Sequence, residues 1–541
     1  MATNFRNKSA NVSRFSMVPR ADVPRSVFSA EQMHKTTFDA GWLVPIYLDE
    51  ILPGDSVNLK MTAFVRLGPT VFPIMDNLHL DTFFFFVPNR LVWDNWRKFM
   101  GETQDNDYIV PTRTMDLDGY TVGSIYDYMG LPVAGQIQAG GVQNFNHNVL
   151  PLRGYNLIWN EWFRDQELQA ELPVVKTDLD GGTEYFLQKR GKRHDYFTSA
   201  RPWPMRDTDY TSGDFGMGIE RFAVRGGAPV SGLGALNSTA TYTNQPAFES
   251  GGDVPTYGAA KLLNESGAAN GVLMKLDEAG FPDIRVQIND LRQAFAVQRL
   301  LERDARGGTR YTEIVRSHFG VQSPDARLQR PEYLGGGSSP ITVAPVAVTA
   351  NDEYSQTSRP VGDLGGVVTG VATNHGCSGS FTEHGFLIGL ASVRADLTYQ
   401  QGVNRMWNRE TRFDYYWPAF ANLGEQPIYR REIYVTGDPS NDEVVFGYAE
   451  RWAEYRHKPS RMSGRFRSTS SGTLDPWHLA QRFTAAPVLG SGFIAENPPL
   501  DRVMAVSDGY NANQVLMDAM FSVRMVRPIP AWSVPGLSDH F

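Results

Sequence analysis

The strict alternation of apolar and other residues from Val57 to Arg66 constrains this chain more than any other stretch. Every second residue from Val57 to Val65 is apolar, and most of the residues between them are polar or charged. A period of two is typical of a β-strand with one buried face, because successive side chains point to opposite sides. Gly68 and Pro69 then interrupt the pattern, as expected of a turn. The stretch therefore predicts a half-buried strand.

A second apolar run, Leu78–Pro88, contains four consecutive phenylalanines at Phe83–Phe86. In a strand these rings point alternately to the two faces, so both faces must be covered. We expect the cover to be either the other layer of a sandwich or a neighbouring subunit. Proline cannot donate a ladder hydrogen bond, so Pro88 is expected to end the strand. Asn89 is then expected to cap a short helix that contains tryptophan.

The chain is long for a single compact core. Its 541 residues indicate either several domains or one domain with large insertions. With 12% aromatic residues, 51 glycines and 33 prolines, a β-rich protein with many turns and long loops is favoured. Later strands are predicted at Phe386–Val393, Ile428–Val435, Glu443–Tyr448 and Asn513–Arg524. Long strands separated by long irregular connections are typical of a jelly roll with insertions.

Composition divides the chain into four parts. Residues 1–40 begin with five basic side chains against one acid and are predicted to form an extended arm. Such an arm suits contact with nucleic acid or a neighbouring subunit, and a frayed, solvated terminus is the alternative. Residues 207–282 are rich in small and polar side chains and are predicted to form a surface insertion. Residues 41–206 and 283–541 are expected to build the core, the latter with a helical insertion.

The sequence lacks the common motifs of catalytic and metal sites. It contains no phosphate-binding loop, no dinucleotide-binding glycine motif, no serine-hydrolase elbow and no His-Glu-x-x-His pair. The single cysteine, Cys377, excludes an intrachain disulfide framework and a multi-thiolate metal site. A reactive pair of Cys377 with His375 is disfavoured, because sequence neighbours rarely form such a dyad. We therefore predict no enzyme activity, no cofactor and no metal-binding residue.

Charge and hydropathy narrow the possible partners. The net charge of -8 argues against binding nucleic acid over the whole surface, although local basic patches remain. The densest basic run, Lys189–Arg193, precedes Tyr196 and Phe197, and cations beside rings suit single-stranded nucleic acid. A surface turn is an equally good interpretation. No run approaches the roughly 18 apolar residues of a membrane span, and the N-terminus lacks the apolar core of a signal peptide.

Five long runs carry a resemblance to a known family. They are Leu150–Asp165, Lys192–Ala200, Leu291–Tyr311, His318–Arg327 and Phe446–Arg456. These runs resemble the major capsid protein of the Microviridae, in particular of the gokushovirus branch, which comprises small tailless phages with circular single-stranded DNA. The resemblance extends from the N-terminal arm to the last predicted strand.

The resemblance implies a mainly β fold, an eight-stranded viral jelly roll with large loop insertions and a few short helices. It implies self-assembly into a T=1 icosahedral shell, with residues 207–282 forming protrusions at the three-fold axes that help attach to a host receptor. The implied partners are further copies of the chain, the DNA genome, a DNA pilot protein, an internal scaffolding protein and a small basic DNA-binding protein. The implied location is the virion, after assembly in the bacterial cytoplasm.

In such a shell, basic side chains of the inner face would hold DNA through phosphate contacts that do not depend on sequence. The candidates are Arg6, Lys8, Arg14, Lys192, Arg193, Arg461, Arg465 and Arg467. A carbohydrate-active or carbohydrate-binding jelly-roll protein is the alternative, since aromatic residues and this fold are shared by lectins and glycosidases. A glycosidase needs two carboxylates across a cleft, and the sequence does not show which acids could pair.

Overall fold

The computed structural model describes residues 25–102, 108–115, 119–136, 145–180, 183–204, 329–349, 361–422, 424–505 and 514–532. The chain divides into two units, 1–204 with 309–541 and 205–308, and every described residue belongs to the first. The predicted insertion at 207–282 and Arg6, Lys8 and Arg14 of the arm lie outside the described residues, as does the segment 283–328, which includes the start of the part predicted to carry a helical insertion.

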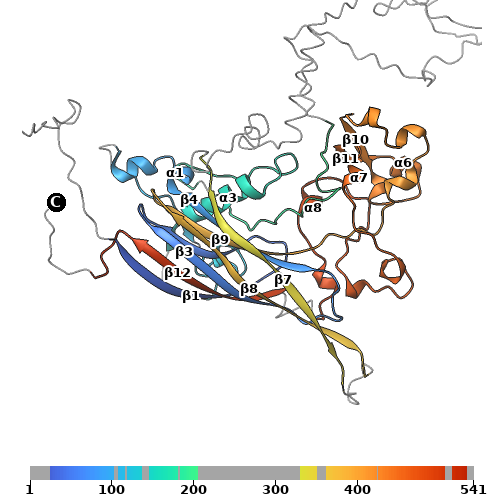
Figure 1. The fold of residues 1–541 in the computed structure, drawn as a ribbon. Helices are drawn as coiled ribbons and strands as arrows, with labels where there is room; N and C mark the ends of the chain where they lie inside the picture. The colour runs from blue at the N-terminus through green and yellow to red at the C-terminus, as the bar shows by residue number, and fades with distance from the viewer. Residues whose placement is uncertain are drawn as a thin grey trace, which may run out of the picture. The chain divides into compact units, whose positions relative to one another are not determined.

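Eight long strands form one antiparallel sheet that curls into a jelly roll (Figure 1). They are β1 (Ser26–Phe38), β2 (Val44–Ile51), β3 (Ser56–Leu67), β4 (Leu78–Pro88), β7 (Glu332–Ala347), β8 (Leu364–Ser380), β9 (Gly385–Ala395) and β12 (Val515–Arg527). Their order is β1-β12-β3-β8-β7-β4-β9-β2. Numbered along the chain, the first, eighth, third and sixth strands form one layer, and the fifth, fourth, seventh and second form the other. This is the double Greek-key order of a jelly roll, so the predicted fold class is confirmed.

The two long connections of the jelly roll carry the smaller elements. The connection from β4 to β7 contains α1 (Asn89–Val92), a π-helical turn (Lys98–Glu102), β5 (Thr112–Met115), α2 (Ile125–Tyr128), β6 (Phe145–Asn148), α3 (Leu150–Ile158) and a second π-helical turn (Trp159–Phe163). The connection from β9 to β12 contains β10 (Glu425–Tyr429), α6 (Pro439–Asp442), β11 (Val445–Glu450), α7 (Ala453–Arg456) and α8 (Ser491–Ile494). No described helix is long and apolar enough to cross a membrane.

Short 3-10 turns also shape the connection from β9 to β12. They are Arg405–Asn408, Arg412–Asp414, Pro418–Phe420, Arg430–Glu432, Gly464–Phe466, Asp475–Trp477 and Leu500–Arg502. The turn Arg430–Glu432 shortens the strand predicted at Ile428–Val435, because β10 already ends at Tyr429. β10 and β11 pair in antiparallel fashion and form a separate two-stranded sheet.

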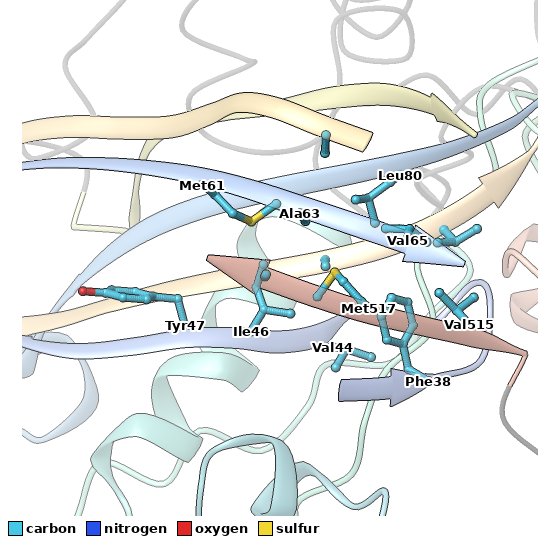
Figure 2. Close-up of a cluster of buried hydrophobic side chains, with 14 of the residues drawn as sticks. Phe38, Val44, Ile46, Tyr47, Met61, Ala63, Val65, Leu80, Val515 and Met517 are labelled. Atoms are coloured by element: carbon cyan, nitrogen blue, oxygen red, sulfur yellow. The ribbon is translucent and has the colours of Figure 1, made fainter. Parts of the chain in front are cut away.

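The alternation of apolar residues from Val57 to Arg66 places every second side chain of β3 in the core between the two layers. Residues at every second position of β3 and of β12 are buried, and the two strands pair so that Met61 faces Phe521 and Val65 faces Met517. Figure 2 shows Met61 and Val65 of β3 gathered with Met517 and with Tyr47 of β2 in the space between the layers. The predicted half-buried strand is therefore confirmed.

Both faces of β4 are buried, as its run of phenylalanines predicted. Phe84 and Phe86 belong to the core between the layers, whereas Phe85 packs outside the barrel with Tyr155 and other residues of α3. The outer face of β4 is thus covered by the connection from β4 to β7 of the same chain. Asn89 does not cap the following helix, because α1 begins at Asn89 itself and the preceding Pro88 offers no side-chain hydrogen bond.

The first part of the sheet lies within the predicted N-terminal arm. Residues 26–38 form β1, which pairs with β12 from Ser26 opposite Arg527 to Phe38 opposite Val515. Most side chains of β1 are exposed, so this strand lacks the apolar alternation that marks β3. β1 therefore lies inside the range 1–40 that is predicted to form the arm.

Candidate nucleic-acid interface

A groove of about 720 Å³ lies in the lobe formed by the connection from β9 to β12. Residues 402–409 form one wall and residues 454–462 form the other. Phe197 and Tyr399 lie at its base, with ring centroids 5.1 Å apart in an edge-to-face arrangement. Both rings belong to the buried cluster of this lobe, so the groove has a rigid apolar floor.

The segment after residue 463 is fixed to this floor through Gln400. The Gln400 amide nitrogen donates to the Ser468 hydroxyl at 2.9 Å, and the Ser468 backbone N–H donates to the Gln400 amide oxygen at 2.8 Å. His478 supports the same segment, since its Nε2 lies 2.9 Å from the carbonyl oxygen of Phe466. These contacts position the exposed Arg465 and Arg467, the latter at the edge of the groove.

Trp407 projects from the first wall of the groove. It lies in the turn Arg405–Asn408, which begins where the Asn404 side chain accepts a hydrogen bond from the Met406 N–H at 3.0 Å. The Trp407 side chain is 76% exposed, although tryptophan is usually among the more buried residues. The turn thus presents a large ring at the mouth of the groove.

A buried ion pair holds this turn in place. The Arg405 guanidinium lies 3.2 Å from the Glu432 carboxylate and donates to the Pro427 carbonyl at 2.7 Å. The other Glu432 oxygen accepts a hydrogen bond from the Tyr196 hydroxyl at 2.8 Å. Burial raises the pKa of Glu432, while the nearby Arg405 charge opposes that rise. Because Arg405 is anchored inward, the neighbouring Trp407 is directed to the surface.

Arg409 connects the two walls. Its guanidinium donates to the Tyr455 hydroxyl at 2.5 Å and to the Glu454 carboxylate at 3.1 Å, and it lies 4.7 Å from the centre of the Tyr455 ring. The second Glu454 oxygen accepts a hydrogen bond from Gln426 at 2.6 Å. Tyr455 is therefore held in one orientation, although 49% of it remains exposed.

The groove carries an excess of positive charge. Its two carboxylates, Glu432 and Glu454, each pair with an arginine. Lys458, Arg461 and Arg467 also line it, and none of the three pairs with a carboxylate within the described part of the chain. Unpaired cations beside exposed rings are the combination that binds single-stranded nucleic acid.

Comparison with known proteins gives matches over nearly the whole length of the chain. The family described as capsid protein (F protein) matches residues 16–537. The chain belongs to this family. It is 41% identical to the capsid protein VP1 of Chlamydia phage 1, over 99% of this chain and 100% of the relative. It is also 41% identical to VP1 of Bdellovibrio phage phiMH2K (98% of this chain, 99% of the relative) and 34% identical to VP1 of Spiroplasma virus 4 (98% of each).

These matches confirm the resemblance to microviral capsid proteins and a structural role in the virion. Of the DNA-contact candidates in this capsid protein, the structure brings Arg461 and Arg467 together in the groove, with Arg465 exposed nearby. Arg193 is exposed as well but does not line the groove. Contact of these residues with DNA stays a prediction.

Lys192 is placed differently from what its basic neighbourhood suggested. It is only 8% exposed, its ammonium lies 4.6 Å from the centre of the Phe493 ring, and burial lowers its pKa. Its neighbour Arg190 pairs with the buried Asp81, and Lys189 donates to Asn497 at 2.7 Å. Most of the basic run thus stabilises the capsid protein internally, and we exclude Lys192 from the candidate interface.

The sequence neighbours Cys377 and His375 do not form a reactive pair. Cys377 is buried, and burial raises the pKa of its thiol to about 12. The His375 ring is also buried, with Nδ1 2.8 Å from the Thr82 hydroxyl and Nε2 2.8 Å from the Ser339 hydroxyl. Both ring nitrogens are therefore used in hydrogen bonds that join β8 to β4 and β7.

Sequence reasoning missed Trp407, Tyr455 and Lys458. The signal used for residues 189–197, rings beside basic side chains, also occurs at Arg405–Arg409, where a tryptophan stands between two arginines. It did not reveal the groove, because the second wall comes from a segment almost fifty positions later. The contact of Arg409 with Glu454 and Tyr455 brings the two segments together.

Proposed function

We propose that this capsid protein closes a T=1 icosahedral shell around a circular single-stranded DNA genome. The observation that carries the proposal is the match of the full chain to capsid proteins, together with the strand order of a jelly roll. The two long connections of the fold supply loops with which neighbouring subunits can interlock. Stable assemblies of this kind bury far more surface than transient complexes do.

The inner face of the shell holds the genome through arginine and lysine side chains, with Arg193, Arg461, Arg465 and Arg467 as the candidates that are described and exposed. Residues 207–282 form protrusions at the three-fold axes and meet a receptor on the host. Minor virion proteins, namely a DNA pilot protein, an internal scaffolding protein and a small basic DNA-binding protein, join the particle during assembly in the bacterial cytoplasm. These assignments rest on the family to which the chain belongs.

The chain performs this role without catalytic turnover. In the groove, where a glycosidase would need free acids, Glu432 and Glu454 are each paired with an arginine. An acid that donates or accepts a proton at a glycosidic bond must be able to change its charge, and a bound guanidinium opposes that change. Within the described groove, neither acid is therefore free to act as one of the two carboxylates that the carbohydrate-active alternative requires.

Expression of the full-length chain with and without the other virion proteins tests the proposal. We expect sedimentation and negative-stain electron microscopy to show closed particles of uniform diameter whose symmetry is that of a T=1 shell. Open sheets, filaments or a persistent monomer under every assembly condition would refute it. A glycan-hydrolysis assay on the same sample is expected to show no turnover that depends on Glu432 or Glu454.

A further inference from the structure

We infer that the groove between residues 402–409 and 454–462 stacks unpaired bases on Trp407 and Tyr455, while Lys458, Arg461 and Arg467 contact the adjoining phosphates. The inference rests on the proposed function, because assembly must bring the genome to this surface. It goes further in assigning a base-stacking site and a preference for unpaired over paired strands.

Exposed ring surface is the first support. Trp407 is 76% exposed and contacts no other aromatic ring within the described residues, although an indole gains much free energy when its faces are covered. Tyr455 lines the same groove and is about half exposed. Every base has a flat face, so stacking on such rings does not depend on sequence.

The arrangement of charge is the second support. Three cations line the groove without a carboxylate partner, and both groove carboxylates are neutralised by Arg405 and Arg409. The excess of positive charge complements a phosphate backbone. Protein interfaces are enriched in aromatic residues and arginine but depleted in lysine, so Lys458 fits a protein partner less well than a phosphate backbone. In a protein interface Lys458 would be buried without a partner.

Rigidity is the third support. The ion pair of Arg405 with Glu432 fixes the turn that carries Trp407, and Arg409 fixes Tyr455 through its hydroxyl. Rings that are already ordered lose little conformational entropy when a base binds. The groove volume of about 720 Å³ lies within the range of about 300–1,000 Å³ that is usual for small-molecule sites. It is therefore large enough for a base and its sugar.

A preference for single strands follows from the stacking geometry. In a duplex each base face is covered by its neighbours, so a side chain can reach the face only after the base is unstacked. Phosphates, in contrast, are accessible in both forms. Loss of a ring should therefore weaken single-strand binding selectively, and loss of a cation should weaken binding to both forms.

The test uses the unassembled full-length chain with a short oligothymidylate and, in parallel, the same strand annealed to its complement. We expect Trp407→Ala to weaken oligothymidylate binding roughly 5- to 150-fold and to leave duplex binding unchanged. Tyr455→Ala is a second variant with the same expected direction. Trp407→Phe, which keeps a ring, should bind nearly as the unmodified chain does. Trp532→Ala removes a tryptophan that is 87% exposed elsewhere and is the matched control.

Tryptophan fluorescence gives a second reading of the same experiment. Quenching on addition of oligothymidylate should persist in Trp532→Ala and fall sharply in Trp407→Ala. Unchanged oligothymidylate affinity in both ring variants would overturn the inference, as would an equal loss for duplex. Loss of particle assembly with unchanged oligothymidylate affinity would assign this surface to a second copy of the chain and also overturn it. Failure of the unmodified chain to form particles would count against the proposed shell instead.

Discussion

The guanidinium of Arg405 and the carboxylate of Glu432 lie 3.2 Å apart and are largely buried, and Arg405 precedes the exposed Trp407 by two positions. Removing one partner of a buried pair leaves an uncompensated charge, which is expected to cost about 3–5 kcal/mol. We therefore predict that Arg405→Met strongly destabilises the chain, measured as a shift of the urea unfolding midpoint.

The control for this prediction is Arg456→Met. Arg456 pairs with Glu450, but both side chains are about half exposed, and such surface pairs contribute no more than about 1 kcal/mol. A loss of stability in Arg456→Met as large as that in Arg405→Met would show that the buried geometry is not what matters.

Glu496 provides a pH-dependent prediction. Its side chain is buried, and burial raises its pKa to about 6, against the opposing charges of Lys192, Arg190 and Arg394. The folded chain thus holds this proton more tightly than the unfolded chain, so the carboxyl stabilises the fold fully below about pH 4.5. That contribution falls as the pH rises through about 6 and stays lost above it.

Substitution of Glu496 by glutamine isolates this effect. We predict that Glu496→Gln is more stable than the unmodified chain by about 2 kcal/mol at pH 7.5, and that the difference disappears near pH 4. Urea unfolding of both proteins across this pH range is the measurement. A difference that grows on acidification would have the wrong sign and would contradict the assignment.

Gly336 lies where β7 pairs with β4, opposite Phe83. A Cβ atom there would lie 2.0 Å from the backbone carbonyl oxygen of Thr82, which cannot move without breaking the sheet. We predict that Gly336→Ala destabilises the chain by about 3 kcal/mol. Gly365→Ala in β8 is the matched control, because its nearest atom would be 3.8 Å away, and we expect it to change stability by less than about 1 kcal/mol. Equal effects would contradict the close approach.

Substitutions of the basic residues should differ in their effect on the salt dependence of binding to single-stranded DNA. Arg461→Gln and Arg467→Gln are each predicted to lower the slope of log affinity against log salt for single-stranded DNA by about 0.7, because each removes one phosphate contact. Lys192→Met should leave that slope unchanged, since its ammonium already lies over Phe493. Titrations of oligothymidylate at several salt concentrations decide the matter. A reduced slope in Lys192→Met would return this residue to the interface.

Three of the strands predicted from the sequence, β3, β12 and β4, contact the core of the jelly roll in a simple pattern. β3 and β12 alternate strictly, and β4 has apolar residues on both faces. β7 was missed because the run Gly335–Gly337 resembles a loop, whereas neighbouring backbones at Gly335 and Gly336 and the His375 ring at Gly337 leave no room for a Cβ atom. β1 was missed because its exposed side chains carry no apolar alternation.

The candidate site was predicted only in part, for a similar reason. Arg461 and Arg467 are recognisable from local charge, but Trp407 becomes relevant only when Arg409 joins two distant segments. The burial of Lys192 could not be predicted locally, because Phe493, over which its ammonium lies, is three hundred residues further along the chain. Local sequence indicates which side chains could bind DNA, and long-range packing decides which of them are accessible.

Cryo-electron microscopy of purified virions at side-chain resolution tests the central claim most directly. We predict a shell in which every subunit is the jelly roll described above, repeated with T=1 symmetry, with the groove that carries Trp407 facing the genome. A shell whose density fits a different polypeptide, with this chain absent from the particle, would contradict the account.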